Sequence, residues 1–275
     1  LVRTRILGYS MLETPSDTGR DFLAREINSC SDDDDFERLA ILYINRYLHC
    51  FRAVKGRTST PSTRPSRPSF DGMHESLKYL LEEAPQDHTT AKQKAFIRDG
   101  YRCMLTGAFD MFSVERKPHI LPANAPITIT HAAHIFSGSA NVGTSGTDQD
   151  GANHKYAAPV WAVFGNTRVL DELNGANIHR LENVMTLRLN EHSFFDRLKL
   201  WLESTMYRRE IPPTMTFTTP DPEKLPLPSP DYLRLHAAAA RVAHLSGAGE
   251  YIDKLLRDME ETRVLSNDGS SALLL

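Results

Sequence analysis

Apolar residues recur at helical spacing in several separate stretches of the chain, and this pattern predicts helices there. The predicted helices cover residues 36–55, 71–83, 91–99, 160–173, 191–203, 231–245 and 250–264. β-branched and aromatic residues predict strands at residues 101–107 and 127–136, a strand after Asn183, and two short strands at residues 206–211 and 214–218. A few strands among many helices predict an α+β fold.

Two stretches interrupt these elements. Residues 56–69 read GRTSTPSTRPSRPS, and this composition predicts an exposed, flexible linker. Residues 138–155 read GSANVGTSGTDQDGANHK, which predicts a long surface loop. We therefore expect an N-terminal helical region at residues 1–55, the linker at 56–69, a larger domain with the C-terminal helices at 70–265, and a tail at 266–275.

Polar residues gather in and after the strand that ends near residue 136. The segment Thr130 to Phe136 reads THAAHIF and holds two of the eleven histidines, three positions apart. A second polar cluster follows at Asn183, Asn190, His192 and Asp196. Asn190 is a good N-cap, which puts His192 in the first turn of a helix, where free N–H groups and the dipole favour an anion such as phosphate. His192 and Asp196 share one helix face, so the order predicts a ββα unit that carries both clusters.

At these residues the sequence resembles the HNH, or ββα-metal, nucleases, and in particular the HNH proteins that are common in filamentous fungi. The matching segments are RDGYRCMLTG at 98–107, AAHIF at 132–136, ENVMTL at 182–187, LNEHSFFDRLKLWLE at 189–203 and PSPDYLRLHAAAARVAHLSGAGEYIDKLLRDMEE at 228–261. The resemblance implies an HNH ββα-metal core embedded in surrounding α-helices. It also implies a metal-dependent endonuclease that hydrolyses DNA phosphodiester bonds.

Phosphodiester hydrolysis needs a base that activates water and a cation that stabilises charge at phosphorus and on the leaving oxygen. The resemblance implies that His134 is the general base and that His192 holds the metal ion. It implies that Asp196 is a second metal ligand, or a carboxylate that fixes the His192 imidazole. Asn183 matches the family's middle Asn, which is expected to pin the loop and orient His134.

One position departs from the family's pattern. Many HNH enzymes have a metal-binding Asp or His directly before the base, where this chain has Ala133. His131 lies on the same strand face as Ala133, about 7 Å along, and is the candidate for the missing ligand. The expected cofactor is one divalent cation, Mg²⁺ first, with Mn²⁺, Ni²⁺ or Zn²⁺ as alternatives. Because of this departure a pseudonuclease stays open as an alternative, that is, an HNH fold kept as a binding or regulatory module. An RNA-directed nuclease is a third alternative.

The charge of the chain changes the expected contact with nucleic acid. The net charge is -3 at pH 7, whereas nucleic-acid binding rests largely on Lys and Arg that neutralise phosphates. Any basic surface must therefore be local. Arg188, Arg197 and Lys199 flank the motifs and are expected to contact nucleic acid, with DNA as the expected partner. Further basic residues near the motifs are Arg98, Arg102, Arg208 and Arg209.

The cysteines indicate the cellular compartment. There are three, far apart and without a CxxC pair, which argues against a disulfide framework and against the zinc knuckle of many small HNH domains. Cys103 is expected to be a small buried apolar residue. With no long apolar run and no signal-peptide pattern, we expect an intracellular protein, cytoplasmic or nuclear, without membrane contact. Ordinary hydrogen-bonded roles are expected for His119, His154, His179, His236 and His244.

Overall fold

The fold is described from a computed structural model of the 275-residue chain. The structure describes residues 2–48, 51, 87–137, 169, 172–173, 175–203 and 214–254. The predicted helix at 71–83, linker at 56–69, loop at 138–155, strand at 206–211 and tail at 266–275 lie outside these residues, as do most of the helices at 160–173 and 250–264. Helices and two small sheets give the α+β fold that the sequence predicted.

Three helices open the described part of the chain. They are α1 (Val2–Glu13), α2 (Asp17–Asn28) and α3 (Asp33–Tyr43), and a π-helix follows at Ile44–Leu48. Ser16 caps α2 and Asp32 caps α3, because each side chain accepts a hydrogen bond from the N–H three residues further on. The pattern at residues 36–55 predicted the region of α3. Helices α1 and α2 were not predicted. Each buries only two or three residues, and α1 in addition shows little periodicity.

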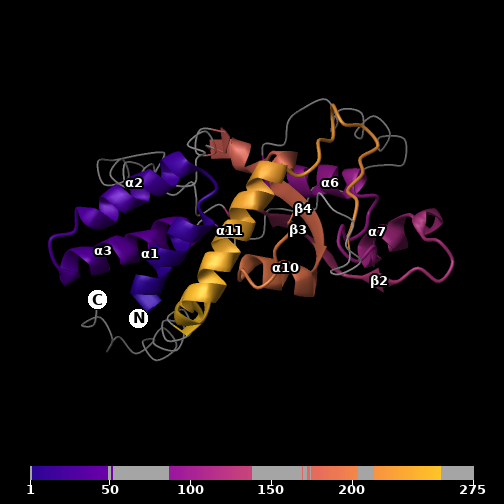
Figure 1. Cartoon of the computed structure of the whole chain (residues 1–275). Helices are drawn as coiled ribbons and strands as arrows, with labels where there is room; N and C mark the ends of the chain where they lie inside the picture. The colour runs from indigo at the N-terminus through magenta and orange to yellow at the C-terminus, as the bar shows by residue number, and fades with distance from the viewer. Residues whose placement is uncertain are drawn as a thin grey trace, which may run out of the picture.

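A ββα unit lies in the middle of the chain, between residues 130 and 196 (Figure 1). Strand β3 (Thr130–His134) pairs antiparallel with β4 (Val184–Arg188), and α10 (Leu189–Asp196) follows directly. The register runs from Thr130 opposite Arg188 to His134 opposite Val184. This confirms the strand predicted after Asn183 and the predicted order strand, strand, helix.

The predicted helix at residues 191–203 is wrong at both ends. Arg188 rather than Asn190 takes the N-cap position, and the helix ends at Asp196. The chain turns there because Leu198 has a left-handed φ of 58°. Leu198 is buried in the core, so packing overrides the helical periodicity of the sequence.

Shorter elements surround the ββα unit. They are α6 (His88–Arg98), β1 (Phe109–Asp110), α7 (Met111–Arg116) and β2 (Ile127–Thr128), with 3-10 turns at Pro118–Ile120, Gly175–His179 and Leu181–Asn183. Strands β1 and β2 pair in parallel as a separate sheet. The segment predicted as one strand at residues 127–136 is therefore two short strands that belong to different sheets.

Three further predictions in this region are wrong. The helix predicted at residues 91–99 begins earlier, at His88, because Asp87 caps α6: its carboxylate accepts a hydrogen bond from Thr90 N at 2.8 Å. Residues 101–107 form turns and one isolated bridge, Arg102 with Phe109, instead of a strand, and Tyr101 has a left-handed φ of 58°. Residues 214–218 have no regular structure.

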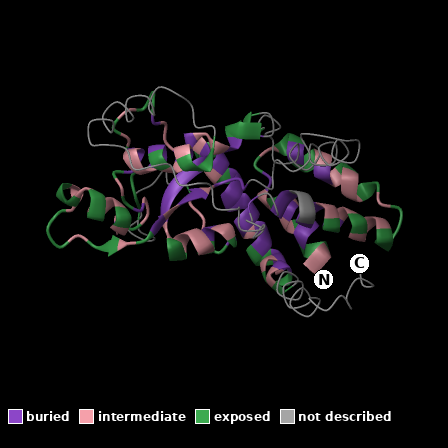
Figure 2. Cartoon of the chain, turned by 180° about the vertical axis from the view of Figure 1, so that it is seen from behind, coloured by how far each residue is buried: buried purple, intermediate pink, exposed green. Residues whose placement is uncertain are grey.

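Helix α11 (Pro230–Ser246) runs between the N-terminal helices and the ββα unit (Figure 1). Ser229 caps its first turn, and Gly247 ends it with a φ of 78°, a left-handed conformation that glycine adopts without strain. This confirms the helix predicted at residues 231–245. Its surface is buried along most of its length (Figure 2). Within the described residues, no helix has both the length and the hydropathy that crossing a bilayer requires.

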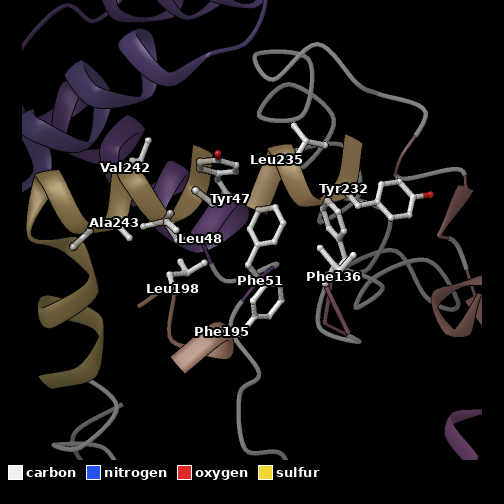
Figure 3. Close-up of a cluster of buried hydrophobic side chains, with 14 of the residues drawn as sticks. Tyr47, Leu48, Phe51, Phe136, Phe195, Leu198, Tyr232, Leu235, Val242 and Ala243 are labelled. Carbon is white, nitrogen blue, oxygen red and sulfur yellow. The ribbon is translucent and has the colours of Figure 1, made fainter. Parts of the chain in front are cut away.

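One hydrophobic core joins the N-terminal helices, α11 and the ββα unit (Figure 3). The Phe51 ring lies 4.6 Å from that of Phe136, which follows β3, and 5.5 Å from that of His236 in α11. His236 stacks on Phe195 of α10 with ring centroids 3.7 Å apart, and its Nε2 donates a hydrogen bond to the Phe195 carbonyl at 3.2 Å. The predicted N-terminal region and the predicted larger domain therefore share this core.

A buried ion pair fastens α6 to β4. Arg98 Nε donates to Asp99 Oδ1 at 2.6 Å, and both side chains are fully buried. The same guanidinium donates to the carbonyls of Leu181 at 2.8 Å, Val184 at 2.7 Å and Pro226 at 3.1 Å. Asp99 in turn accepts a hydrogen bond from Thr186 N of β4 at 3.0 Å. The prediction that Arg98 is a surface cation near nucleic acid is therefore wrong.

Candidate functional site

Six side chains from four elements gather around β3 and form two groups. The His192 group contains His131 of β3 with His192 and Asp196 of α10. The His134 group contains His134 of β3, His88 of α6 and His179 of the 3-10 turn Gly175–His179. After the effect of lost hydration, the charge of His192 lowers the pKa values of both His134 and His88, so the two groups are neighbours.

The His192 group combines two imidazoles with a carboxylate. Asp196 Oδ2 lies 3.3 Å from His192 Nε2, as their spacing of four residues predicted. The His131 ring packs edge-on against that of His192, with centroids 5.8 Å apart. Loss of hydration, then the positive charges of His192 and Lys92, lower the pKa of His131. In the part of the chain that the structure describes, no three His, Cys, Asp or Glu side chains are placed to hold one metal ion, so His131 lies beside the His192 and Asp196 pair without completing a three-donor site.

The His134 group consists of three imidazoles in contact. His134 Nε2 lies 3.2 Å from His179 Nδ1, within hydrogen-bonding distance. The His88 ring stacks on that of His134 with centroids 5.5 Å apart and an interplanar angle of 28°. The pKa of His134 is lowered to about 3, chiefly because burial removes hydration from the charged ring. The positive charges of His88, His179 and His192 lower it further. Loss of hydration also lowers the pKa values of His88 and His179, so the whole group is neutral at pH 7.

Asn183 fixes the chain directly after His134. Its side chain is fully buried, and Oδ1 accepts a hydrogen bond from Phe136 N at 2.9 Å while Nδ2 donates to Phe136 O at 3.1 Å. Nδ2 also donates to Ile178 O at 2.8 Å, next to His179. Asn183 therefore holds both His134 and His179 through their neighbours in the chain, and it lies too deep to contact a substrate.

Asp110 fixes the other end of β3. Its Oδ1 accepts hydrogen bonds from Thr130 Oγ1 at 2.7 Å and Thr130 N at 3.2 Å. Its Oδ2 accepts one from Ser113 N at 2.9 Å and thereby caps α7. The strand that carries His131 and His134 is thus held at both ends by buried polar side chains.

We expect Asn183→Ala to lower the free energy of unfolding by about 2 to 3 kcal/mol, because it removes three hydrogen bonds to buried backbone groups of Phe136 and Ile178. Urea unfolding followed by circular dichroism measures this. Asn177→Ala is the matched control, since Asn177 is exposed in the preceding 3-10 turn, Gly175–His179, and it should change stability by less than about 0.5 kcal/mol. Equal stability of the two variants would contradict the role assigned to Asn183.

The three predicted nucleic-acid contacts lie on the surface around α10. Arg188 donates to Glu191 with an Nε to Oε2 distance of 2.6 Å, and Lys199 Nζ lies 3.2 Å from Asp253 Oδ2. Such exposed ion pairs are weak, so a phosphate can displace the carboxylates. Arg197 is exposed directly after α10, and no carboxylate of the described residues pairs with it.

Three functional candidates were missed in the sequence. His88 was not singled out, His179 was assigned an ordinary role, and Lys92 was not considered. Lys92 lies on α6 close enough for its charge to lower the pKa values of His88 and His131, after the effect of lost hydration. The only sequence signal was proximity to a motif, since His179 lies four residues before Asn183. His88 and Lys92 lie shortly before the segment at 98–107, outside every matching segment, and reach the site through α6.

Two neighbouring positions have structural roles. Ala133 is fully buried and belongs to the same core as Met185 and Leu187, so the position before His134 faces the protein interior. Cys103 is buried, as predicted, and its Sγ accepts a hydrogen bond from Arg188 N at 3.3 Å. That hydrogen bond holds Arg188, the N-cap residue of α10, in place.

Comparison with known proteins finds one similarity, which covers part of the chain. Residues 103–203 match the model of the HNH_2 family, described as HNH endonuclease. No curated protein and no solved structure matches the chain. The matched segment contains β3, β4 and α10, whereas α1, α2, α3, α6 and α11 lie outside it. The match supports an HNH nuclease domain at these residues and, at the level of the family, a nuclease that interacts with nucleic acid.

Proposed function

We propose that the protein is a metal-dependent endonuclease that hydrolyses phosphodiester bonds in DNA. In this proposal His134 is the general base and one divalent cation is held near His192. The observation that carries it is the placement of a neutral, half-buried His134 near His192, on the strand and helix of a ββα unit that matches HNH endonucleases.

The state of His134 suits proton transfer from water. A general base must be unprotonated, and a pKa of about 3 keeps the His134 imidazole neutral at pH 7. A pKa this low also makes the free imidazole a weak base. A bound phosphodiester carries a negative charge, which raises the pKa of a nearby imidazole and so strengthens the base when substrate is present.

The donors of α10 fit a divalent cation. Two ligands at about 2.1 Å from one ion lie about 3.0 to 3.4 Å apart when they subtend 90° to 109°. The observed 3.3 Å between His192 Nε2 and Asp196 Oδ2 falls in this range. The described residues supply no third convergent donor, which suits an ion such as Mg²⁺ that keeps several waters and binds substrate phosphate. When bound, the cation stabilises negative charge on the phosphate and the leaving oxygen.

Cations around the groups suit a polyanion. Lys92 faces both histidine groups from α6, and Arg197 lies exposed beside α10. Arg188 and Lys199 are held by surface carboxylates that phosphate can replace. Lys92 lies near both histidine groups and the other three cations lie at or just after the ends of α10, although the chain as a whole is acidic.

Cleavage of supercoiled plasmid, single-stranded DNA and RNA of matched length tests the proposal. Each substrate is incubated with the purified protein and Mg²⁺, Mn²⁺, Ni²⁺ or Zn²⁺, with a chelator as the blank. We expect plasmid nicking that requires a divalent cation. Cleavage of RNA alone would replace DNA as the substrate, and cleavage that persists in the chelator would contradict the metal requirement.

We expect His192→Ala to weaken binding of Mn²⁺ by at least about tenfold, because it removes a proposed metal ligand. Removing only the hydrogen-bond partner of a ligand already lowers metal affinity by about tenfold or more. Isothermal titration calorimetry of the free protein measures this. His119→Ala is the control, since His119 is exposed and belongs to neither histidine group. Unchanged Mn²⁺ affinity in His192→Ala would place the cation elsewhere.

A second candidate function is a nucleic-acid-binding module without catalysis. It is favoured by Ala133, which is buried where many HNH enzymes have a metal ligand, and by the two-donor set of α10. The cleavage assay separates the candidates. A protein that binds labelled DNA and leaves it intact with every cation would be the binding module.

A further inference from the structure

We propose that His179 is a positioning residue for His134, and that the protonation of His179 decides whether His134 can accept a proton. This inference rests on the proposed function of His134 as general base. The observation behind it is the contact of 3.2 Å between His134 Nε2 and His179 Nδ1. Asn183 fixes the chain next to both residues, so the contact belongs to a rigid part of the site.

The hydrogen bond couples the tautomers of the two rings. When neutral His179 carries its proton on Nε2, its Nδ1 accepts a hydrogen bond from Nε2–H of His134. The Nδ1 lone pair of His134 is then free to take a proton from water. Proton transfer gives an imidazolium whose Nε2–H still donates to His179, so the pair stabilises the charged product.

Acid reverses this hydrogen bond. A second proton makes His179 Nδ1 a donor, and His134 must then accept at Nε2. Neutral His134 now carries its proton on Nδ1, which is the nitrogen that the reaction needs unprotonated. One proton on His179 therefore blocks the base without changing the charge of His134.

The groups that face the pair determine which ring charges first. His88 of α6 stacks on His134 and lies edge-on to His179, with centroids 6.5 Å apart. Loss of hydration and then His88 lower the pKa of His179, while Asp87 raises it, and His192 of α10 acts on His134. Of the two rings, His179 is the less deeply buried and has the nearby carboxylate. Acid therefore protonates His179 first.

Three variants test the inference through the pH dependence of kcat/KM on plasmid DNA. His179→Asn keeps an acceptor near the Nδ1 position and cannot take the second proton, so at pH 8 its rate should stay within about threefold of wild type. Its acid limb should lie about one pH unit lower. His179→Leu removes the acceptor and should lower kcat by about tenfold to a hundredfold at unchanged KM. His119→Asn should behave as wild type. A wild-type rate in His179→Leu, or an unshifted acid limb in His179→Asn, would overturn the inference.

Nitrogen NMR of the histidine side chains gives a readout that needs no cleavage. At pH 8, wild-type His134 should be the Nε2–H tautomer, whereas His179→Leu should show a mixture of tautomers. If this difference is found and no nucleic acid is cut, the proposed function fails and the coupling stands. If DNA is cut and the His134 tautomer is the same in both proteins, the inference alone fails.

Discussion

Replacing His134 by alanine is expected to lower the rate of DNA cleavage by about a thousandfold, within the range that a general base contributes. The imidazole is neutral, half-buried and held by His179, so its removal takes away the proposed proton acceptor. The fold should persist, because β3 is held at its ends by Asp110 and Asn183 and not by His134. Single-turnover cleavage of plasmid and the circular dichroism spectrum measure the two effects.

Chemical rescue makes this test specific. Free imidazole can enter the space left in His134→Ala, and it should restore part of the rate without restoring it in His192→Ala. His244→Ala is the control for a histidine on the surface, since His244 is exposed on α11, and it should keep the wild-type rate. A His134→Ala protein that cuts at the wild-type rate would show that the base is another residue.

Replacing Arg98 by methionine should lower the free energy of unfolding by about 3 to 5 kcal/mol, because it leaves a buried carboxylate without its cation. Asp99 then keeps only the hydrogen bond from Thr186 N among its described partners, and the carbonyls of Leu181 and Val184 lose their donor. Urea unfolding followed by tryptophan fluorescence gives the value.

Two comparisons separate the ion pair from the loss of side-chain volume. The double variant Arg98→Met with Asp99→Asn removes both charges, so it should be less destabilised than the sum of the single variants. Arg102→Met changes an exposed arginine in the following turn and should have little effect. A loss below about 1 kcal/mol in Arg98→Met would mean that the pair contributes no more than a surface ion pair.

The ββα unit could be predicted because its signals are local. β-branched residues mark the strands, and the spacing of His192 and Asp196 alone places them on one face of a helix. The Ala-rich helix at residues 231–245 was predicted for the same reason, and Gly247 marks its end. The prediction that Arg98 lies on the surface was wrong because a charged residue beside a motif is usually exposed. Only the structure shows the backbone carbonyls that accept its hydrogen bonds.

The composition of the histidine groups could not be predicted. His88 and Lys92 come from α6, some forty residues before β3, and only the packing of α6 against β3 and β4 brings them to the site. His179 lies on a short 3-10 turn whose position depends on the buried hydrogen bonds of Asn183. Contacts between distant segments follow from tertiary packing, and a single sequence has no periodic signal for them.

Helix α11 has a consequence for how the protein loses activity. One side of α11 packs on α1, and through His236 it also stacks on Phe195, one residue before Asp196. A protein built around one shared core unfolds cooperatively, so damage to the outer helices spreads to α10. A destabilising substitution in α1 would then reduce the number of competent molecules while each surviving molecule keeps its full turnover. Substitutions in α1, far from the proposed active site, would then determine what fraction of the protein is folded and competent at elevated temperature.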